Sequence, residues 1–326
     1  MKILLFLLLP ALLFAQDLRV ATGTYTGNGA SQSITGVGFT PKLIWVKGNT
    51  AQYGTWRATA HTTAQSSSMA NVAVYTTAIT SIDADGFSVG SSAVANGNTL
   101  TYYWVAFGGD YVESGKVAGT GAEQVVATSF TPDFVLAQAM GIGAAADRHT
   151  YWRGSQQSSN NSDPLVTAQQ GNNGINAIGT NQFTAGVLTS QASDSFYWCA
   201  IDADLTNALE MGSYTGNGGD NRDISMTASW TPEFLLVDNA ALAATDVWRT
   251  TDVAGDEGLR CDNAANLANS IQSVGAGTFQ VGSNVTVNQN LATIYYVAFR
   301  NYVTPTASNT KPGYQGYDRW QRFKTY

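Results

Sequence analysis

Hydrophobic residues along this chain fall in short runs of the kind that form β-strands, and no segment shows a 3.6-residue amphipathic period over three turns. Three runs share one plan, in which a proline and a charged residue precede four apolar residues and a polar end. They occupy residues 41–47, 132–138 and 232–238. A proline that precedes a run of β-branched and aromatic residues predicts a buried strand that starts just after it.

A second set of three runs, at residues 102–107, 196–201 and 294–299, is apolar on both faces. In the first of these runs, Tyr102, Trp104 and Ala106 alternate with Tyr103, Val105 and Phe107. A strand covered on both sides lies in the middle of a sandwich or at a packed face between domains. The sequence Gly27-Asn28-Gly29 predicts a hairpin turn, because Gly and Asn tolerate positive φ. Residues 263–269 are the one stretch predicted to form a helical turn or two.

These patterns recur three times along the chain. The Trp-Arg pairs begin at residues 56, 152 and 248, and matching phenylalanines stand at 87, 183 and 279, so both series advance in steps of 96 residues. The second copy departs most, with Val-Ala-Gly-Thr-Gly at 117–121 where the others have Tyr-Thr-Gly-Asn-Gly. A repeat of this length has the size of a whole domain and exceeds that of a solenoid unit.

The predicted fold is therefore all-β, with three tandem antiparallel β-sandwiches of jelly-roll or immunoglobulin-like type. The junctions near 108–110 and 202–204 are short, which predicts a semi-rigid rod. The predicted boundaries are a signal peptide at 1–15, repeats at 16–110, 111–204 and 205–303, and a C-terminal tail at 304–326.

Composition and charge narrow the choice of partner and compartment. Charged residues make up 12% of the chain and the net charge is −7, which disfavours nucleic acid and anionic lipid surfaces as partners. Lys2, the apolar run at 3–14 and Ala15 have the pattern of a signal peptide, and the run is shorter than the roughly 20 residues of a membrane anchor. We therefore expect a secreted, extracellular or cell-surface protein that has no membrane contact after cleavage.

The two cysteines, Cys199 and Cys261, leave two alternatives open. In an oxidising compartment they could form a disulfide that joins the second and third repeats. They could equally be two buried free thiols.

The Trp-Arg pairs are the most regular polar feature, and they are the candidate binding residues: Trp56, Arg57, Trp152, Arg153, Trp248 and Arg249. Neighbouring residues on a strand point to opposite faces, so one arrangement buries the Trp and exposes the Arg. An aromatic ring with a guanidinium donor would suit a sugar. The alternative is a core Trp with an Arg held by a local carboxylate, and it is favoured because the pair recurs together with the core strands.

Catalytic and metal-binding patterns are weak. His61 and His149 are not equivalent in the repeats, and no zinc cluster, nucleophile elbow or phosphate loop is present. The segment Asp83-Ala-Asp85-Gly86 resembles part of a calcium loop, but a turn before the Phe87 strand explains it better. We therefore expect no metal, no cofactor and no enzymatic activity.

The tail at 304–326 has aromatic residues at every third position. They are Tyr314, Tyr317, Trp320, Phe323 and Tyr326. In a conformation with three residues per turn they would form one stripe. The tail is predicted either to dock on a neighbouring subunit or surface, or to pack on its own third repeat.

Four motifs of the first repeat carry a resemblance: Gly23-Thr-Tyr-Thr-Gly-Asn-Gly29, Gly38-Phe-Thr-Pro41, Gly86-Phe87 and the strand at 102–107. Together they resemble β-sandwich repeats of bacteriophage tail-fibre and virion proteins, which also occur in bacterial surface proteins. The resemblance covers 23–107 and 212–299 well and the second repeat weakly. The signal peptide departs from phage structural proteins and favours a cellular surface over a virion surface.

The leading functional hypothesis is a non-enzymatic extracellular structural or adhesive protein that self-associates into an appendage or filament. One alternative is a glycan-binding array, including a phage fibre that recognises a host surface. Another is a secreted carbohydrate-active enzyme. The expected partners are further copies of the chain or a cell-surface glycan.

Overall fold

The computed structural model describes residues 17–140, 148–157, 162–166, 173–203 and 207–302. The predicted signal peptide at 1–15 and the aromatic tail at 304–326 lie outside these ranges. Within them, the chain is all-β, as predicted, and its strands pair antiparallel in six sheets.

Unit 1 is an antiparallel sandwich of a five-stranded sheet, in the order β1-β8-β3-β4-β5, and a three-stranded sheet, β2-β7-β6. Its elements are β1 (Leu18–Thr26), β2 (Gln32–Thr35), β3 (Leu43–Gly48), β4 (Thr55–Ala58), β5 (Ser67–Ser68), β6 (Ile79–Asp83), β7 (Gly86–Val89), α1 (Ala93–Asn96) and β8 (Thr101–Gly109).

Unit 2 repeats this plan with a five-stranded sheet, β13-β12-β11-β16-β9, and a three-stranded sheet, β10-β15-β14. Its strands are β9 (Val112–Ala118), β10 (Gln124–Ala127), β11 (Phe134–Ala139), β12 (Thr150–Gly154), β13 (Asp163–Pro164), β14 (Ile175–Gly179), β15 (Gln182–Ala185) and β16 (Ser195–Ile201).

Unit 3 has a six-stranded sheet, β17-β25-β19-β20-β21-β22, and a three-stranded sheet, β18-β24-β23. Its elements are β17 (Leu209–Thr215), β18 (Arg222–Ser225), β19 (Phe234–Asn239), β20 (Val247–Thr250), β21 (Glu257–Arg260), β22 (Leu267–Ala268), β23 (Ile271–Gly275), β24 (Thr278–Val281), α2 (Val285–Asn288) and β25 (Thr293–Phe299).

The large sheet of each unit is buried on both faces. In β8, Tyr102, Trp104 and Ala106 belong to the core between the two sheets of unit 1. The alternate residues Val105 and Phe107 belong to a second core, which contains buried residues of all three units. The two apolar faces predicted for this strand are thus both explained, one by the unit's own sandwich and the other by its neighbours.

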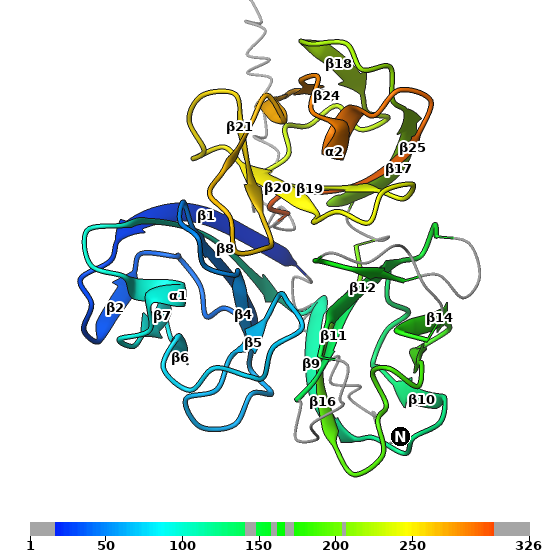
Figure 1. Ribbon diagram of the computed structural model, residues 1–326. Helices are drawn as coiled ribbons and strands as arrows, with labels where there is room; N and C mark the ends of the chain where they lie inside the picture. Colours follow the sequence, from blue (N-terminus) through cyan, green and yellow to red (C-terminus); the bar gives the residue numbers. More distant parts are fainter. Residues whose placement is uncertain (1–16, 141–147, 158–161, 167–172, 204–206, 303–326) are drawn as a thin grey trace, which may run out of the picture.

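The predicted rod is replaced by a closed arrangement of the three units around a common axis (Figure 1), with the large sheets inside and the small sheets outside. Phe234 of unit 3 lies edge-on to Trp45 and Phe107 of unit 1, with ring centroids 5.3 and 5.7 Å apart. Phe134 of unit 2 lies 5.6 Å from Phe299 of unit 3. A rod would leave these rings in water, so burial of apolar surface favours closure.

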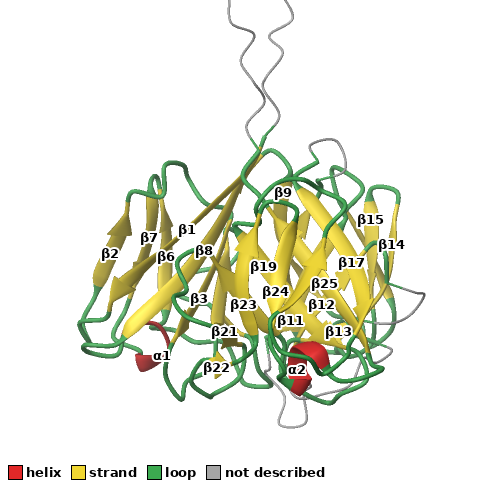
Figure 2. Ribbon diagram, turned by 90° about the horizontal axis from the view of Figure 1, so that it is seen from above, coloured by secondary structure: helices red, strands yellow, loops and turns green. Residues whose placement is uncertain are grey.

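The two described ends of the chain meet and complete the ring of units. Leu18 and Tyr302 form a two-residue antiparallel bridge, with N–H···O distances of 3.1 and 2.7 Å. The side-chain carbonyl of Asn301 accepts a further bond from the Val20 amide at 3.2 Å. In Figure 2, β1 begins at the pole of the molecule opposite α1 and α2. Both ends of the described chain therefore leave the molecule at one pole.

The Gly-Asn-Gly motif is not a hairpin turn, because β1 and β2 belong to different sheets. Instead, Asn28 packs on the end of α1, where its amide donates to Asn96 Oδ1 at 2.9 Å and its Oδ1 accepts from Asn96 Nδ2 at 3.1 Å. Asn217 and Asn288 repeat this pair in unit 3. In unit 2, Thr120 and Ser190 replace the two asparagines, with the Thr120 amide donating to Ser190 Oγ at 3.1 Å. The divergent second motif thus keeps the contact with different residues.

The helical turn predicted at 263–269 is absent. Residues 262–264 form bends, and β22 begins at Leu267. The Ala-rich segment there is held by side-chain contacts: the Ala264 amide donates to Asp262 Oδ1 at 3.1 Å and the Asn266 amide to Asn49 Oδ1 at 2.9 Å.

Candidate functional site: the cleft between the second and third units

The tryptophans of the three Trp-Arg pairs face the common axis and are buried, each at most 1% exposed. Trp56 Nε1 donates to Thr150 Oγ1 of the next unit at 2.9 Å, and Trp152 Nε1 donates to Asp246 Oδ2 at 2.6 Å. Both acceptors stand two residues before the next tryptophan. In unit 1 that position is Gly54, which has no acceptor side chain, and among the described residues Trp248 Nε1 has no partner. The tryptophans therefore join the units, and of the three only Trp152 also borders one of the hollows described below.

The arginines of these pairs point to the opposite face, as expected, but that face is the interior of each sandwich. Arg57, Arg153 and Arg249 are 4 to 7% exposed, so the predicted exposed guanidinium is wrong. The hydrogen bonds of Arg57 and Arg249 go to backbone carbonyls, where a local carboxylate was expected. Arg249 donates to the carbonyls of Val253, Gly255, Glu257 and Ile271. The buried arginines hold loops in place and do not offer an exposed guanidinium to a ligand.

Both cysteines are free thiols in the core, so the disulfide between Cys199 and Cys261 is wrong and the alternative of buried thiols is confirmed. Burial raises the pKa of each thiol, which keeps it protonated and unreactive.

The remaining candidate groups have structural roles. Asp85 accepts from the amides of Gly36 and Gly38, at 3.1 and 2.6 Å, and shapes the turn before β7. His61 is buried, and burial next to Arg57 lowers its pKa to about 3. Among the described residues, no cluster of three or more His, Cys, Asp or Glu could hold a metal ion. No helix in the same ranges is long and apolar enough to cross a membrane.

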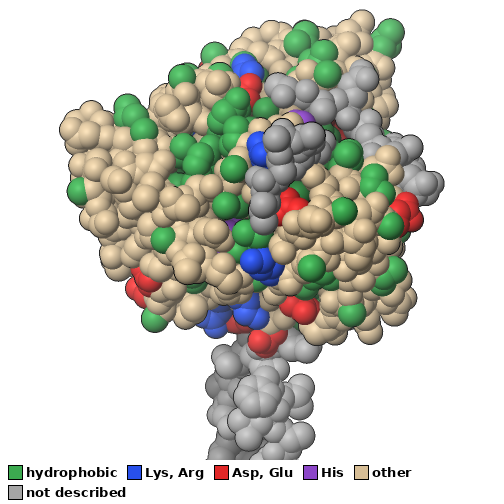
Figure 3. Space-filling view, turned by 60° about the horizontal axis from the view of Figure 1, so that its bottom comes forward, with side chains coloured by type: hydrophobic (Ala, Val, Ile, Leu, Met, Phe, Trp, Pro, Cys, Tyr) green, Lys and Arg blue, Asp and Glu red, His purple; other side chains and the backbone are tan. Residues whose placement is uncertain are grey.

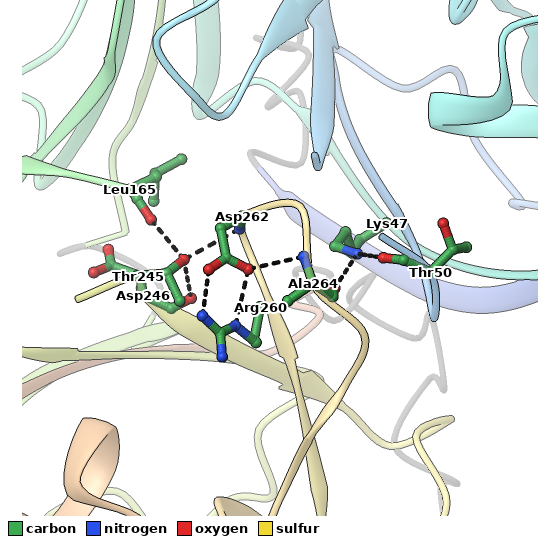
Figure 4. Close-up of polar contacts among 8 residues, drawn as sticks. All are labelled: Lys47, Thr50, Leu165, Thr245, Asp246, Arg260, Asp262 and Ala264. Atoms are coloured by element: carbon green, nitrogen blue, oxygen red, sulfur yellow. Dashed lines mark hydrogen bonds and ion pairs between the residues drawn. The ribbon is translucent and has the colours of Figure 1, made fainter. Parts of the chain in front are cut away.

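A polar network joins the three units near the axis (Figure 4). Lys47 is fully buried, and its Nζ donates to the carbonyls of Gly48, Thr50 and Ala264 at 2.7 to 2.9 Å. Burial lowers the pKa of Lys47 to about 8. Asp262 lies beside this lysine and pairs with Arg260. The Asp262 amide donates to Thr245 Oγ1 at 3.2 Å, and Thr245 Oγ1 donates to the carbonyl of Leu165 in unit 2 at 3.2 Å. The network fixes loops of all three units to one another.

Asp246, at the junction of units 2 and 3, provides a test of this packing. Burial raises its pKa well above the usual value, and the nearby carboxylates of Asp238 and Asp163 raise it further. The stabilising effect of the protonated carboxyl is complete below the unfolded pKa of about 3.9 and is lost as the pH rises through the folded-state pKa. Asp246→Asn should therefore gain stability over the natural protein as the pH rises above about 4, by up to about 1.4 kcal/mol per pH unit.

Denaturant unfolding of Asp246→Asn at a series of pH values measures this gain. Asp252→Asn, at an exposed position, is the matched control and should show no such trend. A difference between Asp246→Asn and the natural protein that does not change with pH would contradict the prediction.

Three equivalent junctions surround the axis, and at each a tyrosine of one unit faces the loop after the Trp-Arg strand of the preceding unit. At the first junction, between units 1 and 2, Tyr197 stacks on His61 with ring centroids 3.8 Å apart and an interplanar angle of 16°. The Tyr197 hydroxyl donates to Gln65 Oε1 at 2.7 Å and accepts from the Thr62 amide at 3.3 Å. This junction is filled.

Ser114 completes the closure of the first junction. Its Oγ lies 2.8 Å from Thr59 Oγ1 and accepts from the Ala60 amide at 3.1 Å. At the third junction, between units 3 and 1, the positions of His61 and Tyr197 belong to the buried Val253 and to Tyr103, which packs against the shared core. Val253 is buried in that core, and Tyr103 remains partly exposed.

The second junction, between units 2 and 3, differs at both partner positions. Gln157 stands in place of His61 and keeps the equivalent hydrogen bonds, accepting from the Gly154 amide at 2.9 Å and donating to Asp163, as His61 accepts from the Ala58 amide and bonds Ser67. It has no aromatic ring to stack on a tyrosine. Met211 stands in place of Ser114 and cannot make the serine's hydrogen bonds; it lies against Gly154, where an added Cβ would come within 2.4 Å of its sulfur. Tyr295, in place of Tyr197, remains partly exposed.

A cleft opens here as three adjoining hollows with volumes of about 90, 190 and 450 Å³. Gln156 and Met211 line all three. The innermost hollow also contains Ser213 and Tyr295. The largest, which Tyr295 does not line, falls within the range of about 300–1,000 Å³ that is usual for small-molecule sites, and the hollow beside Tyr295 is smaller than that range.

The cleft is almost uncharged. Its charged lining residues are Asp133 and Glu210, and no described Lys or Arg lines it. Glu210 already accepts from the amides of Thr227 and Ala228 and from the Tyr296 hydroxyl. Figure 3 shows a face of the molecule on which charged side chains are few and most of the surface is neither charged nor hydrophobic. The cleft therefore presents an aromatic ring, amides and hydroxyls to a ligand. Its few charged groups create only a weak electrostatic field.

The cleft residues were missed because the sequence comparison followed what the repeats share. The informative signal was a difference at aligned positions: tyrosines at 103, 197 and 295 recur, whereas the residues facing them are Val253, His61 and Gln157. Such differences identify a junction that is no longer filled by the chain itself.

A domain family of unknown function, DUF7483, matches residues 19–109. The matched segment coincides with unit 1, so the family describes a single sandwich of the three. None of the curated proteins matches the chain.

Proposed function

We propose that this chain is a secreted, non-enzymatic structural or adhesive protein whose three units act as one rigid head outside the cell. The observation that carries the proposal is the closed arrangement around a shared core, in which both described chain ends leave at one pole. Such a head has one pole from which it can be attached and an opposite pole that is free. The resemblance to tail-fibre and surface-protein repeats supports the same role.

Self-association is the second part of the proposal. Tyr302 lies at the attachment pole, and the sequence that follows it contains aromatic residues and the basic residues Arg319, Arg322 and Lys324, which suit docking on an acidic neighbouring head. The whole chain has a net charge of −7 although its tail is basic, so the rest of the chain is acidic and favours such a contact over random aggregation.

Light scattering and negative-stain imaging of the purified mature protein test this proposal. The full-length chain should form multimers or filaments, and deletion of residues 311–326 should leave monomeric heads with an unchanged melting temperature. A full-length protein that stays monomeric at high concentration would overturn the self-association.

A further inference from the structure

We infer that the cleft between units 2 and 3 binds a neutral saccharide, with Tyr295 as the stacking platform. The inference rests on the proposed adhesive role, for which it names the ligand class, but not on self-association. At the first junction the chain itself occupies the equivalent place, because His61 stacks on Tyr197.

The first junction shows what this position accommodates. There the planar ring of His61 lies on Tyr197 at 3.8 Å, and polar side chains surround the tyrosine hydroxyl. At the second junction the same strand position presents Tyr295, and Gln157, which makes the hydrogen bonds equivalent to those of His61, brings an amide there in place of an aromatic ring. The C–H face of a sugar ring can occupy the place that the imidazole has at the first junction, since both present a flat, weakly polar surface to the tyrosine.

The polar groups around Tyr295 suit hydroxyls rather than charges. The exposed Gln156 offers an amide that both donates and accepts, and the exposed Ser213 offers a hydroxyl. Ser213 pairs in register with Tyr295, where unit 2 has Lys116 opposite Tyr197, so the cation near the first tyrosine is missing at the second. An anionic ligand would find no counter-charge and would approach Glu210 and Asp133.

The size of the cleft fits a chain of sugars better than a single one. The hollow beside Tyr295 is followed by two wider ones that extend past Asn207 to Ser229 along unit 3. A short oligosaccharide could place one ring on Tyr295 and others along Gln156 and Met211, which line the whole cleft.

Saturation-transfer NMR on the full-length mature protein tests the inference with four neutral probes, namely cello-, malto-, xylo- and N-acetylchito-tetraose. Tetragalacturonate serves as the acidic comparison. At least one neutral probe should receive saturation, and tetragalacturonate should not. Tyr295→Ala should weaken that binding at least about tenfold, whereas Tyr295→Phe should retain most of it. Tyr103→Ala, at the equivalent position of the third junction, should bind as the natural protein does.

A second variant fills the cleft from within and does not remove the ring. Gln157→His combined with Met211→Ser recreates the pair that closes the first junction, and it should abolish saccharide binding while keeping or raising the melting temperature. Three results would overturn the inference. In the first, no neutral probe binds; in the second, the protein prefers tetragalacturonate. In the third, both Tyr295→Ala and the Gln157→His, Met211→Ser variant bind a neutral probe as strongly as the natural protein does. If the protein forms multimers but binds no saccharide, only the saccharide inference is wrong. If it binds a saccharide but stays monomeric, only the proposed self-association is wrong.

Discussion

Replacing Phe234 with alanine should destabilise all three units together, by about 4 kcal/mol. Phe234 starts β19 in unit 3 and is 1% exposed. Its ring contacts Trp45 and Phe107 of unit 1 as well as Trp248 and Phe299 of its own unit. Removing the ring leaves a cavity on the common axis, where the stiff sheets around it cannot collapse to fill the space.

Guanidinium chloride unfolding followed by tryptophan fluorescence and by far-UV circular dichroism measures this loss. The natural protein and Phe234→Ala should each give one transition, shifted to lower denaturant in the variant and coincident for the two probes. Val285→Ala, at a valine of the same unit that is 57% exposed, should change the free energy of unfolding by less than about 0.5 kcal/mol. A separate early transition for one third of the signal would show independent units and contradict the shared core.

The strands and their burial could be predicted from the sequence because they depend on local pattern. The runs at 41–47, 132–138 and 232–238 became the strands β3, β11 and β19, and the two apolar faces of residues 102–107 are both buried. The sequence could not predict what covers the second apolar face of residues 102–107. A strand in the middle of a sandwich and a strand at an interface between units both have apolar residues on their two faces, so their sequence patterns are the same. The short junctions fitted a rod and a ring equally well, and the contacts that decide for the ring, such as that of Phe234 with Trp45, join residues far apart in the sequence.

The candidate site was harder to predict for the opposite reason. Repetition emphasised Trp56 and Arg57, which recur because they hold the core and a loop. It concealed Tyr295, which differs from Tyr197 in facing Gln157 where Tyr197 has the stacked ring of His61. The polar pair that recurs in all three repeats therefore has a structural role. The candidate site lies where one repeat has different residues from the other two at aligned positions. This result suits a scaffold of repeated units, in which one junction can change while the other two keep the fold.

Arg249→Met should cost at least about 4 kcal/mol of the free energy of unfolding, although it removes no catalytic or ligand-binding group. The guanidinium is 6% exposed and donates to four backbone carbonyls, of which those of Val253, Gly255 and Ile271 lie 2.6 to 2.9 Å away. Methionine keeps much of the side-chain volume but leaves all four acceptors without their donor. Each buried carbonyl without a partner costs about 1–3 kcal/mol before the loop relaxes or water enters.

Two further variants separate hydrogen bonding from charge. Arg249→Lys keeps the positive charge, but its single nitrogen cannot reproduce the planar set of donors, so its stability should fall between those of the natural protein and Arg249→Met. Arg300→Met removes an arginine whose Nε donates to the exposed carbonyl of Asn207 at 3.0 Å, and it should cost less than about 1 kcal/mol. Hydrogen exchange should show the largest loss of protection in Arg249→Met at residues 251–258, because the guanidinium holds that loop against β23. Protection that falls equally throughout the protein would show that the arginine supports the core as a whole and not this loop.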